Sequence, residues 1–252
     1  MEYIQLTKDN LKKEHICCAI SRAADPAVDS KKAWLADRLD EGLVFLKSAE
    51  RGKCFIEYLP AEMAWVPIDA PGYFYINCLW VAGSFKGHGY SSDLLSRCLE
   101  DAQAQHKKGL CILSSAKKRG FLADPKYLTH KGFRVCDEAS NGIQLWVLPL
   151  AETGPLPQFR PCARQAKTEG EGFTLYYTNQ CPFTAKYVPI LQGIAEQQAV
   201  PLRIIHLDSR ESAQNAPTPT TTFALFWNGA FLTNEIPSEK KFSQLIRDLS
   251  EA

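Results

Sequence analysis

The stretch VAGSFKGHGYSSDLL, residues 81–95, decides how this chain is expected to fold. Gly87, Gly89 and Ser91 stand at every second position, between an apolar run and a segment with helical spacing. A helix N-terminus offers free backbone N–H groups and a partial positive charge, and glycines let an anion come close to them. The stretch therefore predicts a strand, a turn suited to phosphate and the start of a helix. Its spacing differs from both the dinucleotide fingerprint and the nucleoside-triphosphate loop.

The segments around this turn predict a mixture of helices and strands. Aromatic and branched residues dominate YFYINCLWV, residues 73–81, which is the clearest strand. Further strands are expected at residues 2–6, 110–113 and 143–147, with a hairpin of residues 43–49 and 53–59 around Arg51-Gly52. Helices are expected at residues 9–22, at residues 31–39 and from Tyr90 to near Gly109.

Composition narrows the classes of protein that this chain can belong to. A length of 252 residues allows one large domain or two small ones, and a formal net charge of +1 gives no general attraction to nucleic acid or acidic membranes. No apolar run is long enough to span a bilayer, and the N-terminus is too polar for a signal peptide. The nine cysteines form no CxxC or CxxH pair, so we expect no metal site and no disulfide framework. A cytoplasmic protein is the simplest expectation.

Residues 86–91, followed by Asp93-Leu94-Leu95, resemble the acetyl-CoA motif of the GNAT superfamily of N-acetyltransferases. That motif has Arg or Gln, two residues, Gly, one residue, and Gly or Ala, and it opens a helix after a strand. Here Lys86 stands where Arg or Gln is usual, and Ser91 replaces the last Gly or Ala. The simpler alternative is a tight turn whose glycines only permit the path of the backbone. A second similarity favours the acetyltransferase, because KYLTHKGF, residues 126–133, resembles the family's segment that ends in Gly-Phe.

The resemblance implies that acetyl-CoA is the co-substrate and that an amine is the acceptor. It implies a pyrophosphate site at the backbone of Lys86, Gly87, His88, Gly89, Tyr90 and Ser91. It also implies that Leu79, Trp80 and Val81 line the pantetheine, that Ser114 or Ser115 reaches the cofactor, and that Phe121 and Asp124 flank the thioester.

Acetyl transfer to an amine needs a base that removes a proton from the amine and a hydrogen-bond donor to the thioester oxygen. The thiolate must then leave, usually with the help of an acid. Asp124 and Glu57 are the carboxylate candidates for the base, and the N–H of Val81 is a candidate donor to the oxygen. In many relatives a tyrosine four residues before the Gly-Phe glycine is the acid, but here that position is Leu128. The neighbouring Tyr127 is the candidate acid. Unaided departure of the thiolate, with Tyr127 only packing on the sheet, is the alternative.

A first domain is expected at residues 1–150 and a second domain at residues 173–252. The residues between them, 151–172, are polar and contain prolines and glycines, which predicts a linker. Residues 173–179 and 200–207 predict strands, the segment after Cys181 predicts a helix, and Asn228-Gly229 predicts a hairpin turn. A last helix is expected at residues 238–251, capped by Ser238. The spacing of Cys181, Thr184 and the segment PIL at residues 189–191 resembles the thioredoxin pattern CxxCxxxxPIL, with Thr184 replacing the second cysteine.

Cys181 lies at a predicted helix N-terminus, where a thiol is expected to have a lowered pKa and to be nucleophilic. It is therefore a candidate catalytic residue, and the alternative is a remnant thiol on a domain that only binds or packs. Without a second cysteine in the motif, dithiol–disulfide cycling within it is excluded.

The expected fold class is α/β with a mixed sheet: a GNAT acyl-CoA N-acyltransferase fold followed by a small thioredoxin-like βαβ-ββα domain. This combination resembles the YoaP-type bacterial GNAT proteins. The expected function is acetyl-CoA-dependent N-acetylation of a small molecule or peptide, with no nucleic-acid or membrane partner, and a homodimer is left open. One alternative is a monothiol protein that uses Cys181 and has a CoA-binding regulatory domain. A CoA-binding module without turnover is another.

Overall fold

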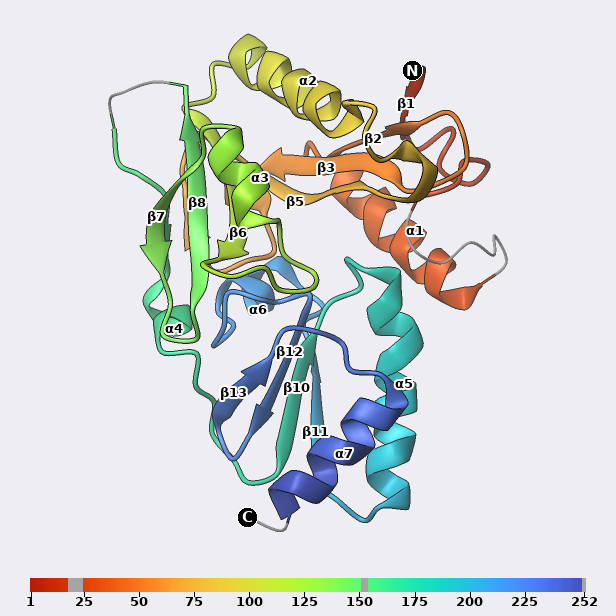
Figure 1. The fold of residues 1–252 in the computed structure, drawn as a ribbon, viewed down its shortest axis with the longest axis vertical. Coiled ribbons are helices and arrows are strands. Elements are labelled where there is room, and N and C mark those ends of the chain that lie inside the picture. Colours follow the sequence, from red (N-terminus) through yellow and green to blue (C-terminus); the bar gives the residue numbers. More distant parts are fainter. Residues whose placement is uncertain (18–24, 151–153, 251–252) are drawn as a thin grey trace.

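The computed structural model describes residues 1–17, 25–150 and 154–250, and these form two large mixed sheets (Figure 1). The first has seven strands in the order β1-β2-β3-β5-β6-β8-β7. Its strands are β1 (Tyr3–Gln5), β2 (Val44–Ser48), β3 (Cys54–Pro60), β5 (Tyr73–Val81), β6 (Gly109–Ser115), β7 (Arg134–Glu138) and β8 (Ile143–Pro149). The strands expected from the sequence are confirmed, including the hairpin of β2 and β3. Sequence analysis missed β7.

The parallel strands β5 and β6 separate along their length. They pair only at three positions, from Tyr73 with Gly109 to Tyr75 with Cys111, although β5 continues to Val81 and β6 to Ser115. A bulge follows immediately on β5, because Glu57 and Tyr58 of β3 lie opposite residues 78 and 76 and leave Asn77 without a counterpart. A bulge bends its strand and increases the local twist. The sheet therefore opens into a wedge at its centre.

Helices cover the two faces of this sheet. On one face lie α2 (Tyr90–Ala104) and α3 (Pro125–His130), and apolar residues of α2 such as Leu94 and Cys98 share a buried cluster with β3, β5 and β6. On the other face α1 (Pro26–Leu39) contributes Trp34 and Leu35 to a second cluster. The prediction began α1 at residue 31 and missed its start signal, an Asp25 side chain that caps Ala27 N with proline at the first position.

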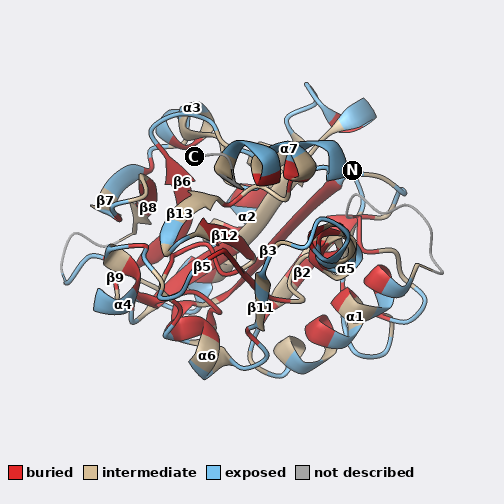
Figure 2. Ribbon diagram, turned by 90° about the horizontal axis from the view of Figure 1, so that it is seen from below, coloured by how far each residue is buried: buried red, intermediate tan, exposed pale blue. Residues whose placement is uncertain are grey.

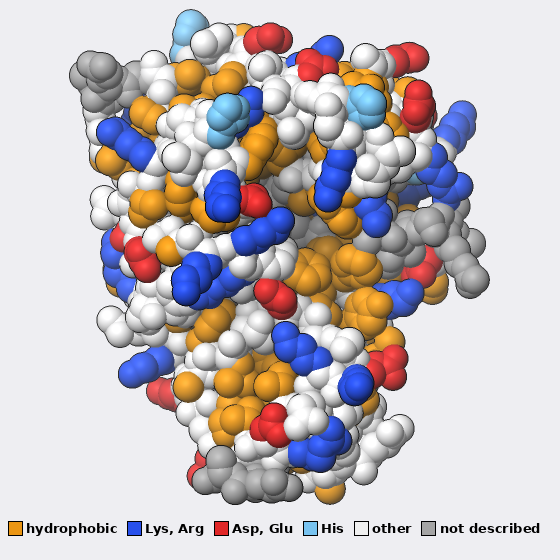
Figure 3. Space-filling view, in the orientation of Figure 1, with side chains coloured by type: hydrophobic (Ala, Val, Ile, Leu, Met, Phe, Trp, Pro, Cys, Tyr) orange, Lys and Arg blue, Asp and Glu red, His pale blue; other side chains and the backbone are white. Residues whose placement is uncertain are grey.

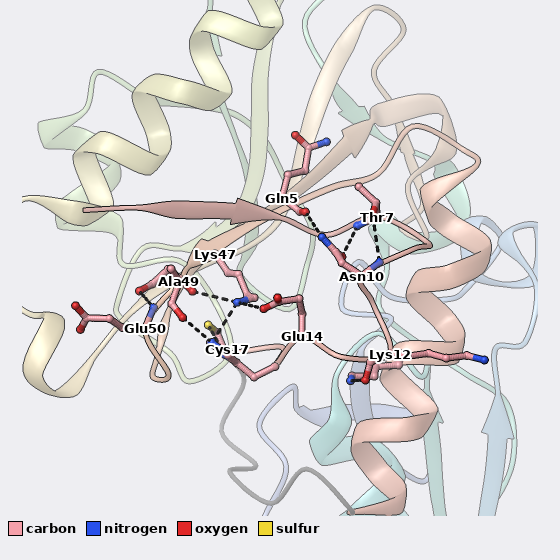
Figure 4. A network of polar contacts seen from close by, with 12 residues as sticks. Gln5, Thr7, Asn10, Lys12, Glu14, Cys17, Lys47, Ala49 and Glu50 are labelled. Atoms are coloured by element: carbon pink, nitrogen blue, oxygen red, sulfur yellow. Dashed lines mark hydrogen bonds and ion pairs between the residues drawn. The ribbon is translucent and has the colours of Figure 1, made fainter.

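The N-terminal segment corrects another prediction. Residues 9–22 were expected to be helical, but residues 9–14 form turns, and residues 18–24 lie outside the described residues. The polar groups of this segment bond to the sheet instead. Asn10 donates to the carbonyl of Gln5 at 2.9 Å, and Glu14 pairs at 2.8 Å with Lys47, which is completely buried (Figure 4). These tertiary contacts override the helical periodicity.

The second sheet has the order β11-β10-β12-β13. Its strands are β10 (Phe173–Tyr177), β11 (Leu202–His206), β12 (Phe223–Trp227) and β13 (Ala230–Thr233), and its helices are α5 (Pro182–Gln197), α6 (Arg210–Gln214) and α7 (Glu239–Ser250). Strand β10 is parallel to β11 and antiparallel to β12. The βαβ-ββα order is confirmed, with α6 as an unpredicted addition. The hairpin turns at Asn228-Gly229, where both residues have positive φ, and Ser238 accepts from Lys241 N at the start of α7.

The segment predicted to be a structureless linker contains regular structure. Strand β9 (Gln158–Phe159) pairs with β4 (Ile68–Asp69), and α4 (Pro161–Arg164) follows. Phe159 is buried, and Arg164 binds both oxygens of Asp137 at 2.8 and 3.0 Å. No local periodicity signals these elements, because contacts to distant strands hold them in place.

The second sheet packs against the first sheet on the face that carries α1 (Figures 1 and 2). Tyr176, Ala224 and Phe226 belong to the same buried cluster as Trp65 and Tyr75 of the first part. The side-chain amide of Gln214 donates to the carbonyls of residues 62 and 64, and Thr221 donates to the carbonyl of Trp65. Within the described part of the chain, no helix has the length and hydropathy that a membrane crossing requires.

Candidate active site

The glycine turn follows β5 through a short 3-10 helix, Gly83–Phe85, whose Phe85 is buried. Gly87 and Gly89 have φ values of 82° and 78°, a region that favours glycine. A Cβ built on either residue meets no atom within 4 Å, so the outer side of the turn is open. Gly89 begins α2 without any side-chain cap. The turn thus presents bare backbone at the positive end of a helix.

The backbone N–H groups of residues 87–91 have no hydrogen-bond partner within the described ranges. The next two N–H groups, of Ser92 and Asp93, bond to the carbonyl of Gly89 at 2.9 and 3.1 Å. Free N–H groups at a helix N-terminus suit an anion. Lys86 and His88 are exposed beside them, and the rings of His88 and Tyr90 stack at 5.5 Å. Free N–H groups beside an exposed lysine suit a phosphate group.

A cavity of about 370 Å³ lies between the two sheets, where β5 separates from β6. One wall comes from β5, β6 and residues 121–123, and the opposite wall comes from the start of α5 and residues 219–223. In the space-filling view, hydrophobic side chains gather in a hollow at mid-height between the upper and lower parts (Figure 3). Leu79 and Trp80 line the cavity as predicted for the pantetheine slot, whereas Val81 lies beyond it, next to the turn.

A buried ion pair lies in the wall of this cavity. The ammonium of Lys31 on α1 is 2.6 Å from Glu57 on β3, and the two side chains are 1% and 2% exposed. Asn77, the bulge residue of β5, donates to the other oxygen of Glu57 at 2.8 Å. The ammonium also lies 4.4 Å from the centre of the Trp34 ring. Both oxygens of Glu57 are therefore engaged, and the pair adds no net charge to the cavity.

Cys181 lines the same cavity, at the first turn of α5. Burial raises the pKa of its thiol, and this outweighs the N–H of Phe183 and the ammonium of Lys31, which both favour the thiolate. The expectation of a lowered pKa at this helix N-terminus is therefore wrong. Its physical basis was sound, but the first sheet covers the thiol, and desolvation disfavours the charged form. Cys78 also lines the cavity, and burial raises its pKa as well.

The other predicted catalytic residues lie outside the cavity lining. Asp124 caps α3 by accepting from Lys126 N and pairs with Lys118 at 3.3 Å. Burial acts to raise the pKa of Asp124, but these contacts outweigh it and hold the pKa below its usual value. The hydroxyl of Tyr127 donates to the carbonyl of Ser91 at 2.9 Å, and burial raises the pKa of Tyr127.

Ser114 is buried and donates to the carbonyl of Ala123 at 2.7 Å, while Phe121 lines the cavity and meets Phe183 edge to face. The sequence did not single out the other polar residues of the lining, which are Lys31, Asn77, Gln180, Thr220, Thr221, Thr222 and Asn234. None of these lies in a recognisable motif. For Asn77 the signal would have been the bulge in β5, which only the strand pairing reveals. In the part of the chain that is described, no three His, Cys, Asp or Glu residues gather as a metal site.

Residues 8–119 match the acetyltransferase (GNAT) family, and residues 201–244 match the YoaP-like family. The chain is 43% identical over 251 residues to the uncharacterized N-acetyltransferase YoaP of Bacillus subtilis (strain 168), a match that covers 99% of this chain and 100% of that protein. The chain belongs to the GNAT acetyltransferases, in the YoaP-like group.

Solved structures of GNAT acetyltransferases are also similar to this chain. The Brucella melitensis GNAT acetyltransferase in complex with acetyl-CoA is 15% identical, with a TM-score of 0.38, and the match covers 62% of this chain and 91% of that one. The Elizabethkingia anophelis GNAT acetyltransferase with acetyl-CoA bound is 20% identical, with a TM-score of 0.39, and the match covers 59% of this chain and 97% of that one.

Proposed function

We propose that this protein transfers the acetyl group of acetyl-CoA to an amine held in the cavity between its two sheets. The observation that carries the proposal is the wedge between β5 and β6, which opens beside a turn with unpartnered backbone N–H groups. When bound, acetyl-CoA supplies the activated acetyl thioester. In this proposal the N–H groups of residues 87–91 hold the pyrophosphate, and the free edge of β5 at Leu79 and Trp80 holds the pantetheine.

The assignment of proton transfer depends on which side chains are not already engaged in hydrogen bonds or ion pairs. Asp124 is occupied as a helix cap and ion-pair partner, and both oxygens of Glu57 accept from neighbours. We assign Tyr127 the task of fixing α3 against the first turn of α2, because its hydroxyl already donates to Ser91. The thiolate then leaves unaided, since a thiol with a pKa of about 8.5 is a tolerable leaving group.

The proposal gives the two parts of the chain different tasks. Residues 1–150 form the acetyltransferase domain, residues 151–172 connect it, and residues 173–252 close the acceptor side of the cavity. The alternative of an independent monothiol protein is less well supported, because Cys181 lines the same cavity and burial keeps its thiol protonated. We therefore assign Cys181 to the wall of the acceptor site.

The test is thermal unfolding of the full chain with and without acetyl-CoA. Ligand at about 100 times its Kd adds roughly 2.7 kcal/mol to the free energy of unfolding. The Gly89→Trp variant should lose the shift, because a side chain at this open position occupies the phosphate approach. Gly170→Trp is the matched control, since Gly170 also has a positive φ and open space around its Cβ position. An absent shift in the unaltered protein, or an unchanged shift in Gly89→Trp, refutes the assignment.

A further inference from the structure

Two residues of the cavity lining each have a buried side-chain oxygen that lacks a hydrogen-bond partner among the described residues. These oxygens are the side-chain carbonyl oxygens of Asn77, on β5, and Gln180, immediately before α5. Buried polar atoms in native proteins normally have a partner, and an unpaired one calls for an explanation. Two acceptors of the same kind, from residues of one cavity that lie in different parts of the chain, indicate a ligand that brings hydrogen-bond donors.

The orientation of the Asn77 amide is determined by its neighbours. Its nitrogen donates to Glu57 at 2.8 Å, and Lys31 holds the other oxygen of Glu57 at 2.6 Å. A carboxylate accepts hydrogen bonds and cannot replace this nitrogen as a donor. The Asn77 oxygen is therefore left as the free end of the amide. The chain from Lys31 to Glu57 to Asn77 keeps an acceptor available in the cavity wall.

The chemistry of a primary amine matches two such acceptors. Its neutral form carries two N–H donors and one lone pair. If each N–H donates to one carbonyl oxygen, the lone pair remains free to attack a thioester carbon. A secondary amine has a single N–H and leaves one of the two oxygens without a partner.

The other lining residues indicate the chemical character of the acceptor apart from its amino group. Among the described lining residues, Lys31 and Glu57 are the only charged ones, and they neutralise each other. Most of the other lining side chains are apolar, including Tyr75, Ile112 and Phe183. A cavity of about 370 Å³ is near the lower end of the usual range for small-molecule sites. It suits a small, uncharged body.

We propose that Asn77 and Gln180 together hold the amino group of the acceptor, and that the acceptor is a small primary amine with an apolar body. This inference rests on the proposed acetyl transfer. The amine nitrogen forms a bond to the acetyl carbon, the C–S bond breaks, and its electron pair leaves on the CoA sulfur. The nitrogen loses one proton, which the thiolate takes up, and the products are an N-acetylamine and CoA. The second sheet thus contributes half of the amine site through Gln180.

The experiment uses acetyl-CoA with phenethylamine as the primary-amine probe, and follows N-acetyl product by mass spectrometry. N-methylphenethylamine is the secondary-amine comparison, and spermidine tests a charged body. We expect kcat/KM for phenethylamine to exceed that for either comparison by about tenfold or more, since an unpaired buried acceptor or a buried extra charge weakens binding.

The decisive variant is Gln180→Met, which keeps the length of the side chain and removes its acceptor. We expect the KM for phenethylamine to rise about tenfold, the size expected for losing a hydrogen bond to a polar or charged group, while the KM for acetyl-CoA stays the same. Gln180→Glu keeps an acceptor oxygen, so its KM for phenethylamine should stay below that of Gln180→Met. Gln192→Met, at an exposed position on α5, is the matched control and should change neither constant.

The outcomes separate this inference from the proposed function. If acetyl-CoA raises the unfolding temperature but phenethylamine is not acetylated, the acceptor assignment is wrong and cofactor binding stands. An unchanged KM for phenethylamine in Gln180→Met also overturns the inference. If acetyl-CoA itself produces no shift, the proposed function fails first.

Discussion

The buried pair of Lys31 and Glu57 makes a strong prediction, because each side chain is at most 2% exposed. Replacing Lys31 by Met keeps most of its volume and removes its charge. The carboxylate of Glu57 then remains buried with only Asn77 as a donor. Breaking such a pair from one side costs about 3–5 kcal/mol. For a chain of this size, 1 kcal/mol shifts Tm by about 2–4 °C, so we expect a fall of about 6–20 °C.

A double variant that also removes the charge of Glu57 tests the same reasoning. In a Lys31→Met, Glu57→Gln double variant no charge is left uncompensated, so at least half of the lost stability should return. Lys32→Met is the matched control on the same helix, because Lys32 is only half-buried and bonds to a single carbonyl, that of Lys12. We expect it to cost less than about 1 kcal/mol.

Urea unfolding of the wild type, the single variant and the double variant measures these differences. A loss below about 1 kcal/mol, or a double variant no more stable than the single, would refute the reasoning.

Two further predictions concern the residues that the sequence nominated for chemistry. Tyr127→Phe removes the hydrogen bond to the Ser91 carbonyl, so it should cost about 1 kcal/mol of stability in urea unfolding and change kcat less than threefold; a tenfold fall in kcat with a changed pH profile would instead identify the hydroxyl as the acid. Burial raises the pKa of Cys181, so its alkylation by iodoacetamide should still accelerate above pH about 8.5, the ordinary pKa of a cysteine. Acetyl-CoA should slow this alkylation and leave that of the exposed Cys162 unchanged, and a Cys181 that is alkylated fully at pH 7 within minutes would contradict the burial argument.

Local features of the sequence were sufficient for much of the fold. Alternating and aromatic-rich segments identified most of the strands, because a half-buried strand imposes a period of two on its own residues. The glycine turn was recognisable because Gly87 and Gly89 adopt positive φ, which few other residues tolerate. The helix that was expected at residues 9–22 but is absent from its described residues 9–17, and the unrecognised strand β9, have a common cause. Both segments take their conformation from distant partners, Lys47 in one case and β4 in the other.

The glycine turn was predictable from the sequence, and the set of polar residues in the cavity wall was not. Residues 86–91 are consecutive, so their spacing alone was enough to indicate an anion-binding turn. Lys31, Glu57, Asn77 and Gln180 come from α1, β3, β5 and the start of α5, and no spacing relates them. Lys31, Glu57 and Asn77 meet within the first part of the chain, and Gln180 joins the same cavity because the second sheet packs onto the first.

By itself the sequence determined most of the strands, the glycine turn and the order in which the two sheets follow each other along the chain. These features depend on backbone conformation and side-chain periodicity, which are properties of neighbouring residues. The tertiary structure decided the site between the sheets. It opens β5 from β6 after Tyr75, and it covers Cys181 so that desolvation outweighs the helix N-terminus. It also leaves the side-chain oxygens of Asn77 and Gln180 buried without a hydrogen-bond donor among the described residues. Burial and hydrogen bonding between distant segments exist only once the chain has folded, and these control the chemistry of the site.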